Sequence, residues 1–335
     1  MEPITDVRDI SRIAYGFMAS RALFAALDLG IFDHLAGEPR KVDAVSRDTG
    51  IAPNRLLVLL SALLSVGLVV RDGDGYRNAP ASQDFLVRGR PKFYGDYLRV
   101  VNGQLAYPYL MELDRGLRGE QRARSFYEVY YSDPKQAAAF TRAQHSGSLG
   151  PATLLARRID LSERRRLLDV GGGSGAFTIT LCQRWPQLTA TIVDFPQTVD
   201  VARQCAAAAG LADRIRHLPG NALEVDWPPQ QDVILMSYLW SAIGRGDIET
   251  LIARTAGTLV PGGLLLVHDF MVKVDLSGPP IAAWHLLASV LDNPEISCLT
   301  TDLVGRSLAA GGFQLISGDD LVPGITSLVV ARKPA

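Results

Sequence analysis

Residues 167–175 read Leu-Leu-Asp-Val-Gly-Gly-Gly-Ser-Gly, and this stretch decides the fold class of the chain. Its apolar residues are typical of a strand buried in a parallel sheet, and its glycines let the backbone turn sharply against a ligand. The helix expected from Ala176 onward directs its first N–H groups at that ligand. The stretch therefore predicts a doubly wound α/β sheet with a ligand site at its carboxyl edge.

An acidic residue ends the next predicted strand. The apolar run from Ala190 leads to Asp194, nineteen residues after Gly175. A carboxylate at that strand tip can accept hydrogen bonds from both hydroxyls of a ribose. Dehydrogenases and methyltransferases share loops of this kind, so loop and acid together indicate a nucleoside cofactor without naming it.

Later segments complete the predicted sheet. Residues 232–238 and 259–270 each read as a buried strand, and a Pro-Gly-Gly turn lies within the second. Residues 311–317 and 325–332 are close enough in sequence to pair antiparallel at one sheet edge. A nicotinamide dehydrogenase would place its loop at the first strand of its domain and add a second mononucleotide half. The sequence has neither feature.

Loop, acid and element order together resemble the class I S-adenosylmethionine-dependent methyltransferases, in particular the small-molecule enzymes related to acetylserotonin and plant phenolic O-methyltransferases. The resemblance covers nearly the whole chain. It implies that residues 101–335 form a Rossmann-like, mostly parallel seven-stranded domain that binds S-adenosylmethionine. Residues 101–160 would be a helical connection that lines the substrate pocket. Residues 1–100 would be a winged-helix-like dimerisation domain, so a homodimer is expected.

The first hundred residues also read as a separate unit without reference to that family. Helical spacing covers three stretches, at residues 10–29, 42–49 and 54–66. A hairpin is predicted over residues 68–78, which completes a pattern that DNA-binding repressors share. The second helix of that pattern carries only one cation, Arg55, and the hairpin tip is acidic, which opposes phosphate binding. The apolar stretch 13–29 fits a dimer interface better.

The composition of the chain argues against a nucleic-acid-binding, membrane-spanning or disulfide-rich protein. A net charge of −1, from 34 basic and 35 acidic residues, gives no global reason to bind nucleic acid or an acidic membrane. The apolar stretch 13–29 contains Arg21 and Asp28, so it predicts an amphipathic helix and not a membrane span. The three cysteines are too few and too scattered for a disulfide framework or a zinc cluster. A reducing, cytoplasmic location is therefore expected.

The resemblance assigns cofactor contacts to individual residues. The expected contacts are three glycines near the methionine part and the ribose, an acid on the ribose hydroxyls and an aromatic ring beside the adenine: Gly171, Gly173, Gly175, Asp194 and Phe195. Ser237, at the tip of the fourth strand, occupies a position that relatives place near the methionine carboxylate.

One cofactor position departs from its relatives. They follow the third strand with Gly-Asp-Met or Gly-Asp-Phe, whereas this chain has Gly220-Asn221-Ala222. The side-chain oxygen of Asn221 can accept a hydrogen bond from the adenine amino group. An ordinary turn residue after Gly220 is an equally good interpretation.

A larger departure follows the fourth strand. Relatives that methylate phenols have Leu-His-Asp-Trp there, and that histidine deprotonates the acceptor. Here residues 237–244 read Ser-Tyr-Leu-Trp-Ser-Ala-Ile-Gly, which puts Ser241 on the histidine and Ala242 on the aspartate. Neither is a general base near neutral pH without a partner. A thioether or neutral amine already offers a lone pair, so orientation and desolvation suffice for it.

Other histidines are candidate bases or substrate contacts. His268 precedes Asp269 at the end of the fifth strand, His145 lies on a helix predicted over residues 137–148, and His285 follows Trp284. For each of them, a surface or hydrogen-bonded core histidine is the commoner role. A metal site of His268, Asp269 and His285 is conceivable, but spacing alone selects nothing and no metal is expected.

The predicted pocket helix is more polar than in relatives, which carry Phe-Asn-x-x-Met there. Residues 140–145 read Phe-Thr-Arg-Ala-Gln-His, which favours a small, polar or anionic substrate. The expected substrate contacts are Arg142, Gln144, His145, Trp240, His268 and His285. Aromatic residues can also surround the cation that methylation of sulfur or nitrogen creates, or belong to the core: Tyr107, Tyr109, Tyr130, Tyr131, Trp240 and Trp284.

These features are similar to the bacterial methylthiohydroxybutyrate S-methyltransferases of dimethylsulfoniopropionate synthesis. That resemblance implies S-methylation of a thioether hydroxy acid. O-methylation of a secondary metabolite, with His268 or His145 as the base, is the first alternative. N- or C-methylation and a non-catalytic, cofactor-binding regulator also remain open.

Overall fold

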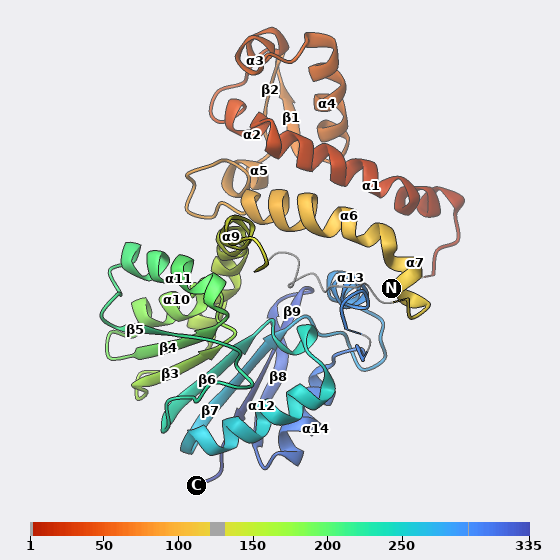
Figure 1. Cartoon of the computed structure of the whole chain (residues 1–335). Helices are drawn as coiled ribbons and strands as arrows, with labels where there is room; N and C mark the ends of the chain where they lie inside the picture. Colours follow the sequence, from red (N-terminus) through yellow and green to blue (C-terminus); the bar gives the residue numbers. More distant parts are fainter. Residues whose placement is uncertain (1–2, 121–130, 294) are drawn as a thin grey trace. The chain divides into compact units, whose positions relative to one another are not determined.

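The chain folds into two units in the computed structural model, Met1–Pro108 and Tyr109–Ala335. The structure describes residues 3–120, 131–293 and 295–335 (Figure 1). The boundary at residue 108 lies shortly after the one that the sequence predicts at residue 100. None of the described helices has the length and apolar character that crossing a membrane requires.

The first unit is a set of helices with one antiparallel hairpin. Three leucines of the fourth helix, Leu56, Leu60 and Leu63, are fully buried at helical spacing and pack on Phe32 and Val45. Its elements are α1 (Val7–Asp28), α2 (Ile31–His34), α3 (Val42–Thr49), α4 (Pro53–Ser65), β1 (Val69–Asp72), β2 (Gly75–Asn78), α5 (Pro80–Phe85) and the π-helical segment η1 (Tyr97–Ala106).

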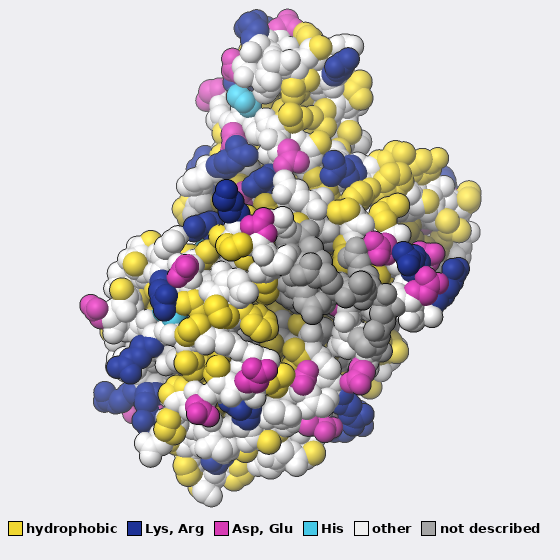
Figure 2. Space-filling model, in the orientation of Figure 1, with side chains coloured by type: hydrophobic (Ala, Val, Ile, Leu, Met, Phe, Trp, Pro, Cys, Tyr) yellow, Lys and Arg dark blue, Asp and Glu magenta, His cyan; other side chains and the backbone are white. Residues whose placement is uncertain are grey.

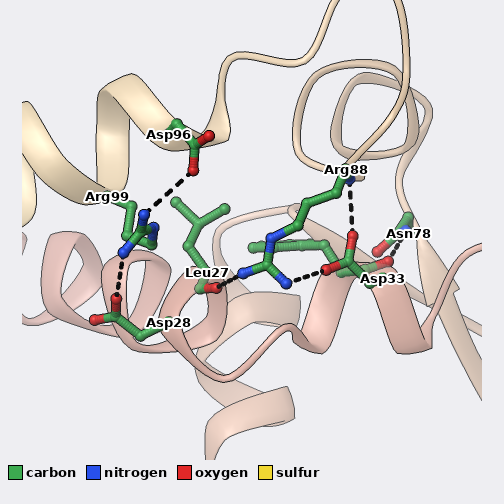
Figure 3. Close-up of polar contacts among 8 residues, drawn as sticks. Leu27, Asp28, Asp33, Asn78, Arg88, Asp96 and Arg99 are labelled. Carbon is green, nitrogen blue, oxygen red and sulfur yellow. Dashed lines mark hydrogen bonds and ion pairs between the residues drawn. The ribbon is translucent and has the colours of Figure 1, made fainter. Parts of the chain in front are cut away.

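Arg88 and Arg99 connect later segments of this unit to its first helices through hydrogen bonds and ion pairs (Figure 3). The backbone N–H and the guanidinium of Arg88 donate to the two carboxylate oxygens of Asp33, at 2.8 and 2.9 Å. The same guanidinium donates to the Leu27 carbonyl at 3.2 Å. From η1, Arg99 lies 3.7 Å from the Asp28 carboxylate. The Arg99 contact holds η1 alongside α1, and the Arg88 contacts hold the segment after α5 against α1 and α2.

The second unit is built on a seven-stranded sheet of order β5-β4-β3-β6-β7-β9-β8. The first five strands in this order are parallel to one another, and β9 is antiparallel to both β7 and β8. This confirms the predicted Rossmann-like, mostly parallel sheet with an antiparallel pair at one edge. The strands are β3 (Arg166–Val170), β4 (Thr189–Asp194), β5 (Ile215–Pro219), β6 (Gln231–Ser237), β7 (Leu259–Asp269), β8 (Gln314–Val322) and β9 (Thr326–Arg332).

Helices cover both faces of this sheet (Figure 1). Alternate strand residues point to opposite faces, so Leu266 packs in the cluster with α9 and α10, and Leu265 packs in the cluster with α12 and α14. The helical segments are η2 (Leu110–Glu112), α7 (Leu113–Leu117), α9 (Pro134–Arg158), α10 (Ala176–Arg184), α11 (Pro196–Ala208), η3 (Trp240–Ala242), α12 (Arg245–Thr258), α13 (Pro280–Ser289) and α14 (Thr301–Ala310); α6 (Tyr107–Tyr109) spans the boundary between the units.

The helix that is expected to line the substrate pocket is longer than the sequence predicts. It was expected over residues 137–148, but α9 runs from Pro134 to Arg158 and passes through Pro151. The side chain of Asp133 caps its first turn by accepting from the Lys135 N–H. Beyond the proline, Leu155 is fully buried against the sheet, and this packing offsets the backbone hydrogen bond that a proline removes.

Candidate functional site

The Gly-rich loop joins β3 to α10 at the carboxyl edge of the sheet. Gly173 and Gly175 have φ angles of +55° and +78°, in the left-handed region that favours glycine. A Cβ on Gly175 would lie 2.8 Å from the Ile192 side chain, whereas nothing lies within 4 Å of one on Gly173. The loop is therefore packed on one side and open for a ligand on the other, and α10 presents its first N–H groups to that opening.

Asp194 ends β4 beside this loop. Its Oδ2 accepts from the Gly173 N–H at 2.7 Å, and its Oδ1 accepts from the Phe195 N–H at 2.7 Å. Burial raises the pKa of this carboxyl, while the two N–H donors act in the opposite direction. Each oxygen keeps further lone pairs for ligand hydroxyls. The Phe195 ring is 43% exposed and available to a flat ligand.

A second acid, Asp169, lies beneath the loop and was not predicted as a site residue, although it belongs to the quoted motif. It is 1% exposed, and its Oδ2 accepts from the Thr178 hydroxyl at 2.6 Å. Its Oδ1 has no hydrogen-bond partner among the described residues. Burial, with a smaller contribution from the charge of Asp194, raises the pKa of Asp169 to about 7. A nearby cationic ligand would stabilise its ionised form.

Asn221 and Ala222 follow β5, as the sequence predicts. Asn221 Oδ1 accepts from the Leu223 N–H at 3.0 Å, and its side-chain amide donates to Glu224 at 3.0 Å. The Ala222 carbonyl accepts from the Trp227 indole at 3.0 Å. Asn221 thus makes the local hydrogen bonds of a turn residue, and its oxygen keeps a second lone pair for the predicted contact with the adenine amino group.

The tip of β6 leads into a hydrogen-bonded chain of three side chains. Ser237 Oγ lies 2.9 Å from His268 Nδ1, and His268 Nε2 lies 2.9 Å from Thr326 Oγ1. His268 is fully buried, which lowers its pKa to about 3. Both of its ring nitrogens are engaged within the protein, and its neutral form dominates at physiological pH.

Ser241, which is expected at the position of the histidine of phenol-methylating relatives, is hydrogen-bonded to a buried acid. The Ser241 hydroxyl donates to Asp269 Oδ1 at 2.7 Å, and its N–H donates to Oδ2 at 3.0 Å. Burial raises the pKa of Asp269 to about 6, while these hydrogen bonds act in the opposite direction. Trp240 is buried on this face of the sheet, with its indole N–H 3.4 Å from the Met236 sulfur.

The predicted substrate residues of α9, which are Arg142, Gln144 and His145, do not gather at one place. His145 Nδ1 lies 2.9 Å from the hydroxyl of Ser174 in the Gly-rich loop, and burial lowers the pKa of His145. Arg142 instead donates to Gln204 of α11 at 2.9 Å and is exposed. Gln144 is half-buried on the same helix.

Aromatic rings connect His268 to His285. The Tyr238 ring lies 4.6 Å from the ring of His268 and 5.1 Å from that of Phe270, which stacks on His285 at 3.8 Å. Burial lowers the pKa of His285 to about 4. Trp284 is exposed and is not part of this row, and Tyr130 lies outside the described residues.

The described residues contain no group of three or more His, Cys, Asp or Glu side chains that could hold a metal ion. Their arrangement does fit S-adenosylmethionine. Open space at Gly173 admits the ligand, Asp194 stands where a ribose needs an acceptor, and the orphaned oxygen of Asp169 faces no protein donor. Together with the sheet order, these features define a class I S-adenosylmethionine-dependent methyltransferase.

Comparison with known proteins identifies the family. The model of the O-methyltransferase domain matches residues 115–291, and that of the O-methyltransferase dimerisation domain matches residues 11–88. The chain is 31% identical to the tetracenomycin polyketide synthesis 8-O-methyl transferase TcmO of Streptomyces glaucescens over 100% of both chains. It is 28% identical to the N,N-dimethyltransferase OxyT of Streptomyces rimosus over 81% of this chain and 80% of OxyT.

A solved structure agrees over the whole length. Human N-acetylserotonin methyltransferase in complex with S-adenosylmethionine superposes with a TM-score of 0.86 and 25% identity, covering 100% of both chains. The protein therefore belongs to the O-methyltransferase family that includes the acetylserotonin enzymes, and S-adenosylmethionine is its cofactor.

Proposed function

We propose that this protein methylates an acceptor that does not have to lose a proton, and that the acceptor is the thioether of a small hydroxy acid. The observation that carries this proposal is the Ser241–Asp269 pair at the family's usual base position. A serine hydroxyl becomes a base only if another group first takes its proton. Asp269, whose pKa is about 6, is far too weak a base to do so at neutral pH.

A thioether fits this arrangement because its methylation moves no proton. A lone pair of the acceptor sulfur forms the new S–CH3 bond, and the electrons of the breaking bond stay on the cofactor sulfur. Positive charge passes from one sulfonium to another. Tyr238, just after β6, is half-buried, and an aromatic ring face at this edge of the sheet can stabilise such a cation.

The structure of the pocket helix supports a polar acceptor. Gln144 and His145 are half-buried on α9, and His145 contacts the Gly-rich loop through Ser174. Arg142 does not contribute to this argument, because its guanidinium is paired with Gln204 on an exposed surface.

O-methylation of a secondary metabolite is the second candidate, and the full-length similarity to TcmO favours it. Its base would be His145. The lowered pKa keeps this imidazole neutral at physiological pH and therefore able to accept a proton. His268 is a weaker candidate because both of its nitrogens are engaged in hydrogen bonds.

The pH–rate profile and alanine variants separate the two candidates. Acceptors would be screened by release of S-adenosylhomocysteine, with a thioether hydroxy acid, a thiol, an amine and a phenol in the panel. For thioether methylation, kcat should be flat from pH 6 to 9, and His145→Ala and His285→Ala should each lower it by less than about tenfold. Loss of a general base would lower it by roughly 10²–10⁴-fold.

His34→Ala, in the first unit, controls for a general effect of losing a histidine. An alkaline gain in rate that disappears with His145 would identify the protein as an O-methyltransferase with a relocated base. A chain that binds the cofactor but turns over no member of the panel would point instead to a regulatory protein.

We also propose that the first unit mediates formation of a homodimer. Helix α1 leaves large apolar side chains exposed, among them Ile13 at 70% and Phe17 at 51%, and Figure 2 shows hydrophobic side chains gathered along this unit. An apolar surface of this kind fits a self-association site. Ile13→Asp together with Phe17→Asp should give monomers in light scattering, whereas Arg47→Glu on α3 should leave the dimer intact. Wild-type protein that is monomeric at micromolar concentration would contradict the proposal.

A further inference from the structure

We propose that His268 is a positioning residue: Thr326 holds its imidazole in the Nδ1–H tautomer, and this makes Ser237 a hydrogen-bond donor to the carboxylate of the cofactor's methionine part. This inference rests on the cofactor and on the proposed place of Ser237 beside it. It does not depend on which acceptor is methylated.

The three side chains come from neighbouring strands and share one face of the sheet. Ser237 is the last residue of β6 and pairs in register with His268 of β7, and Thr326 begins β9 on the other side of β7. Ser237 also stands next to the Gly-rich loop in the sheet, since the preceding residue, Met236, pairs with Val170 at the end of β3. One end of the chain is therefore deeply buried and the other end reaches the ligand edge.

The proton positions follow from which groups have acceptors. Thr326 is 1% exposed, and among the described residues its hydroxyl has one recorded partner, His268 Nε2. A buried hydroxyl is destabilising when its proton has no acceptor, so the Thr326 O–H donates to Nε2. Nε2 must then be unprotonated, and the single proton of the neutral ring lies on Nδ1.

That proton determines what Ser237 offers. Nδ1–H donates to Ser237 Oγ at 2.9 Å, which leaves the serine's own O–H to donate elsewhere. In the Nε2–H tautomer, Nδ1 is an acceptor and the Ser237 O–H would donate to it. Ser237 would then have only oxygen lone pairs to offer the ligand. An imidazolium would also leave the Thr326 O–H without an acceptor, and it would add a buried charge.

The surroundings of His268 keep the ring neutral and fixed. The rings of Tyr238 and Phe177 lie 4.6 and 5.3 Å from it, and the residue has no exposed surface. Its imidazole cannot reach substrate directly, so its effect on the reaction passes through Ser237. The ligand group that suits a neutral serine donor at this edge is an oxygen acceptor, and the methionine carboxylate of the cofactor supplies one.

The tautomer is measurable without any substrate. In protein labelled with ¹⁵N-histidine, two-dimensional spectra at pH 7 distinguish Nδ1–H from Nε2–H rings, and His268→Gln identifies its signal among the five histidines. We expect the Nδ1–H pattern in the wild type and in Thr326→Ser, which retains the hydroxyl. Thr326→Val, which is nearly isosteric and lacks it, removes the donor that fixes the ring and should no longer show the Nδ1–H form alone. An Nε2–H ring in the wild type would overturn the proposal, whatever the variants do.

Binding measurements test the consequence at Ser237. Ser237→Ala should weaken S-adenosylhomocysteine by roughly 10–100-fold, the scale of one hydrogen bond to a charged group. Methylthioadenosine, which lacks the methionine carboxylate, should bind this variant as it binds the wild type. Thr326→Val should reproduce part of the loss, roughly tenfold, and Thr326→Ser should not. Equal losses for both ligands, or equal affinities in the two Thr326 variants, would contradict the relay even if methyl transfer itself is intact.

Discussion

Asp194 and Asp269 end two strands of the same sheet, and both bind backbone N–H groups of the turns beside them. Asp194 holds two N–H groups, those of Gly173 and Phe195, and is only half-buried. Asp269 is completely buried and accepts from the Ser241 hydroxyl as well as from the N–H groups of Ser241 and Phe270.

The difference shows how one residue type at equivalent strand ends takes opposite roles. The hydrogen bonds of Asp194 shape the Gly-rich loop and leave oxygen lone pairs at an open edge, where a ribose can use them. The hydrogen bonds of Asp269 are made entirely with the chain, which stabilises the turn after β6. The first carboxylate is thus suited to a ligand, and the second to the fold.

Asp194→Ala gives the largest expected effect on function. Loss of a charge-assisted pair to the ribose should weaken S-adenosylhomocysteine by about 2–4 kcal/mol in calorimetry. Asp200→Ala, on the exposed face of α11, is the matched control and should bind normally. If NAD binds the wild type more tightly than S-adenosylmethionine does, the assignment of Asp194 to this cofactor fails.

The pH dependence of stability tests the buried member of the pair. The pKa of Asp269 is about 6 in the folded protein and near 3.8 when unfolded, so between these values the folded state holds more protons. Asp269 by itself should therefore lower the free energy of unfolding by roughly 3 kcal/mol as pH rises from about 4 to about 6, and contribute no further change above that range.

Asp269→Asn should remove this part of the slope, as measured by urea denaturation across that pH range. Asp169 contributes in the same direction, and the buried His268 and His285, whose pKa values are lowered, contribute in the opposite one. All three titrate in both proteins, so the difference between the two curves isolates Asp269. Parallel curves for wild type and variant would show that Asp269 ionises as freely in the fold as outside it.

Ser241→Ala gives the smallest expected effect. The hydroxyl's hydrogen bond to Asp269 is lost, which should cost about 0.5–1.5 kcal/mol of unfolding free energy, while the backbone N–H groups remain bound. Activity should stay within tenfold of wild type. A fall in kcat of more than a hundredfold in a folded variant would show that Ser241 takes part in the reaction. The Ser241–Asp269 pair would then serve the ligand site, as Asp194 does, and not the fold alone.

Much of the fold could be predicted because its signals are local. The Gly-rich loop, the strand-tip acid and the run of buried strands predict the parallel sheet, and the structure confirms it. The length of α9 could not be predicted, because Pro151 reads as a breaker and only the packing of Leu155 on the sheet shows why the helix continues.

The site was less accessible to sequence analysis. The position of His268 after a predicted strand places it at the ligand edge. Its partner Thr326 lies 58 residues further along the chain, so the sequence could not show that both ring nitrogens of His268 are hydrogen-bonded inside the protein. The orphaned oxygen of Asp169 was hidden in the same way, since it depends on what packs beneath the loop. Chemistry at a strand tip is set by neighbours that sequence order does not reveal.

The order of strands also has a consequence for synthesis. Strand β9 lies between β7 and β8, yet it follows both in the chain. While the ribosome is still translating residues 270–325, the outer edge of β7 has no partner, and an unpaired apolar edge can join to another chain. This edge is closed only when residues 326–332 emerge and pair with β7.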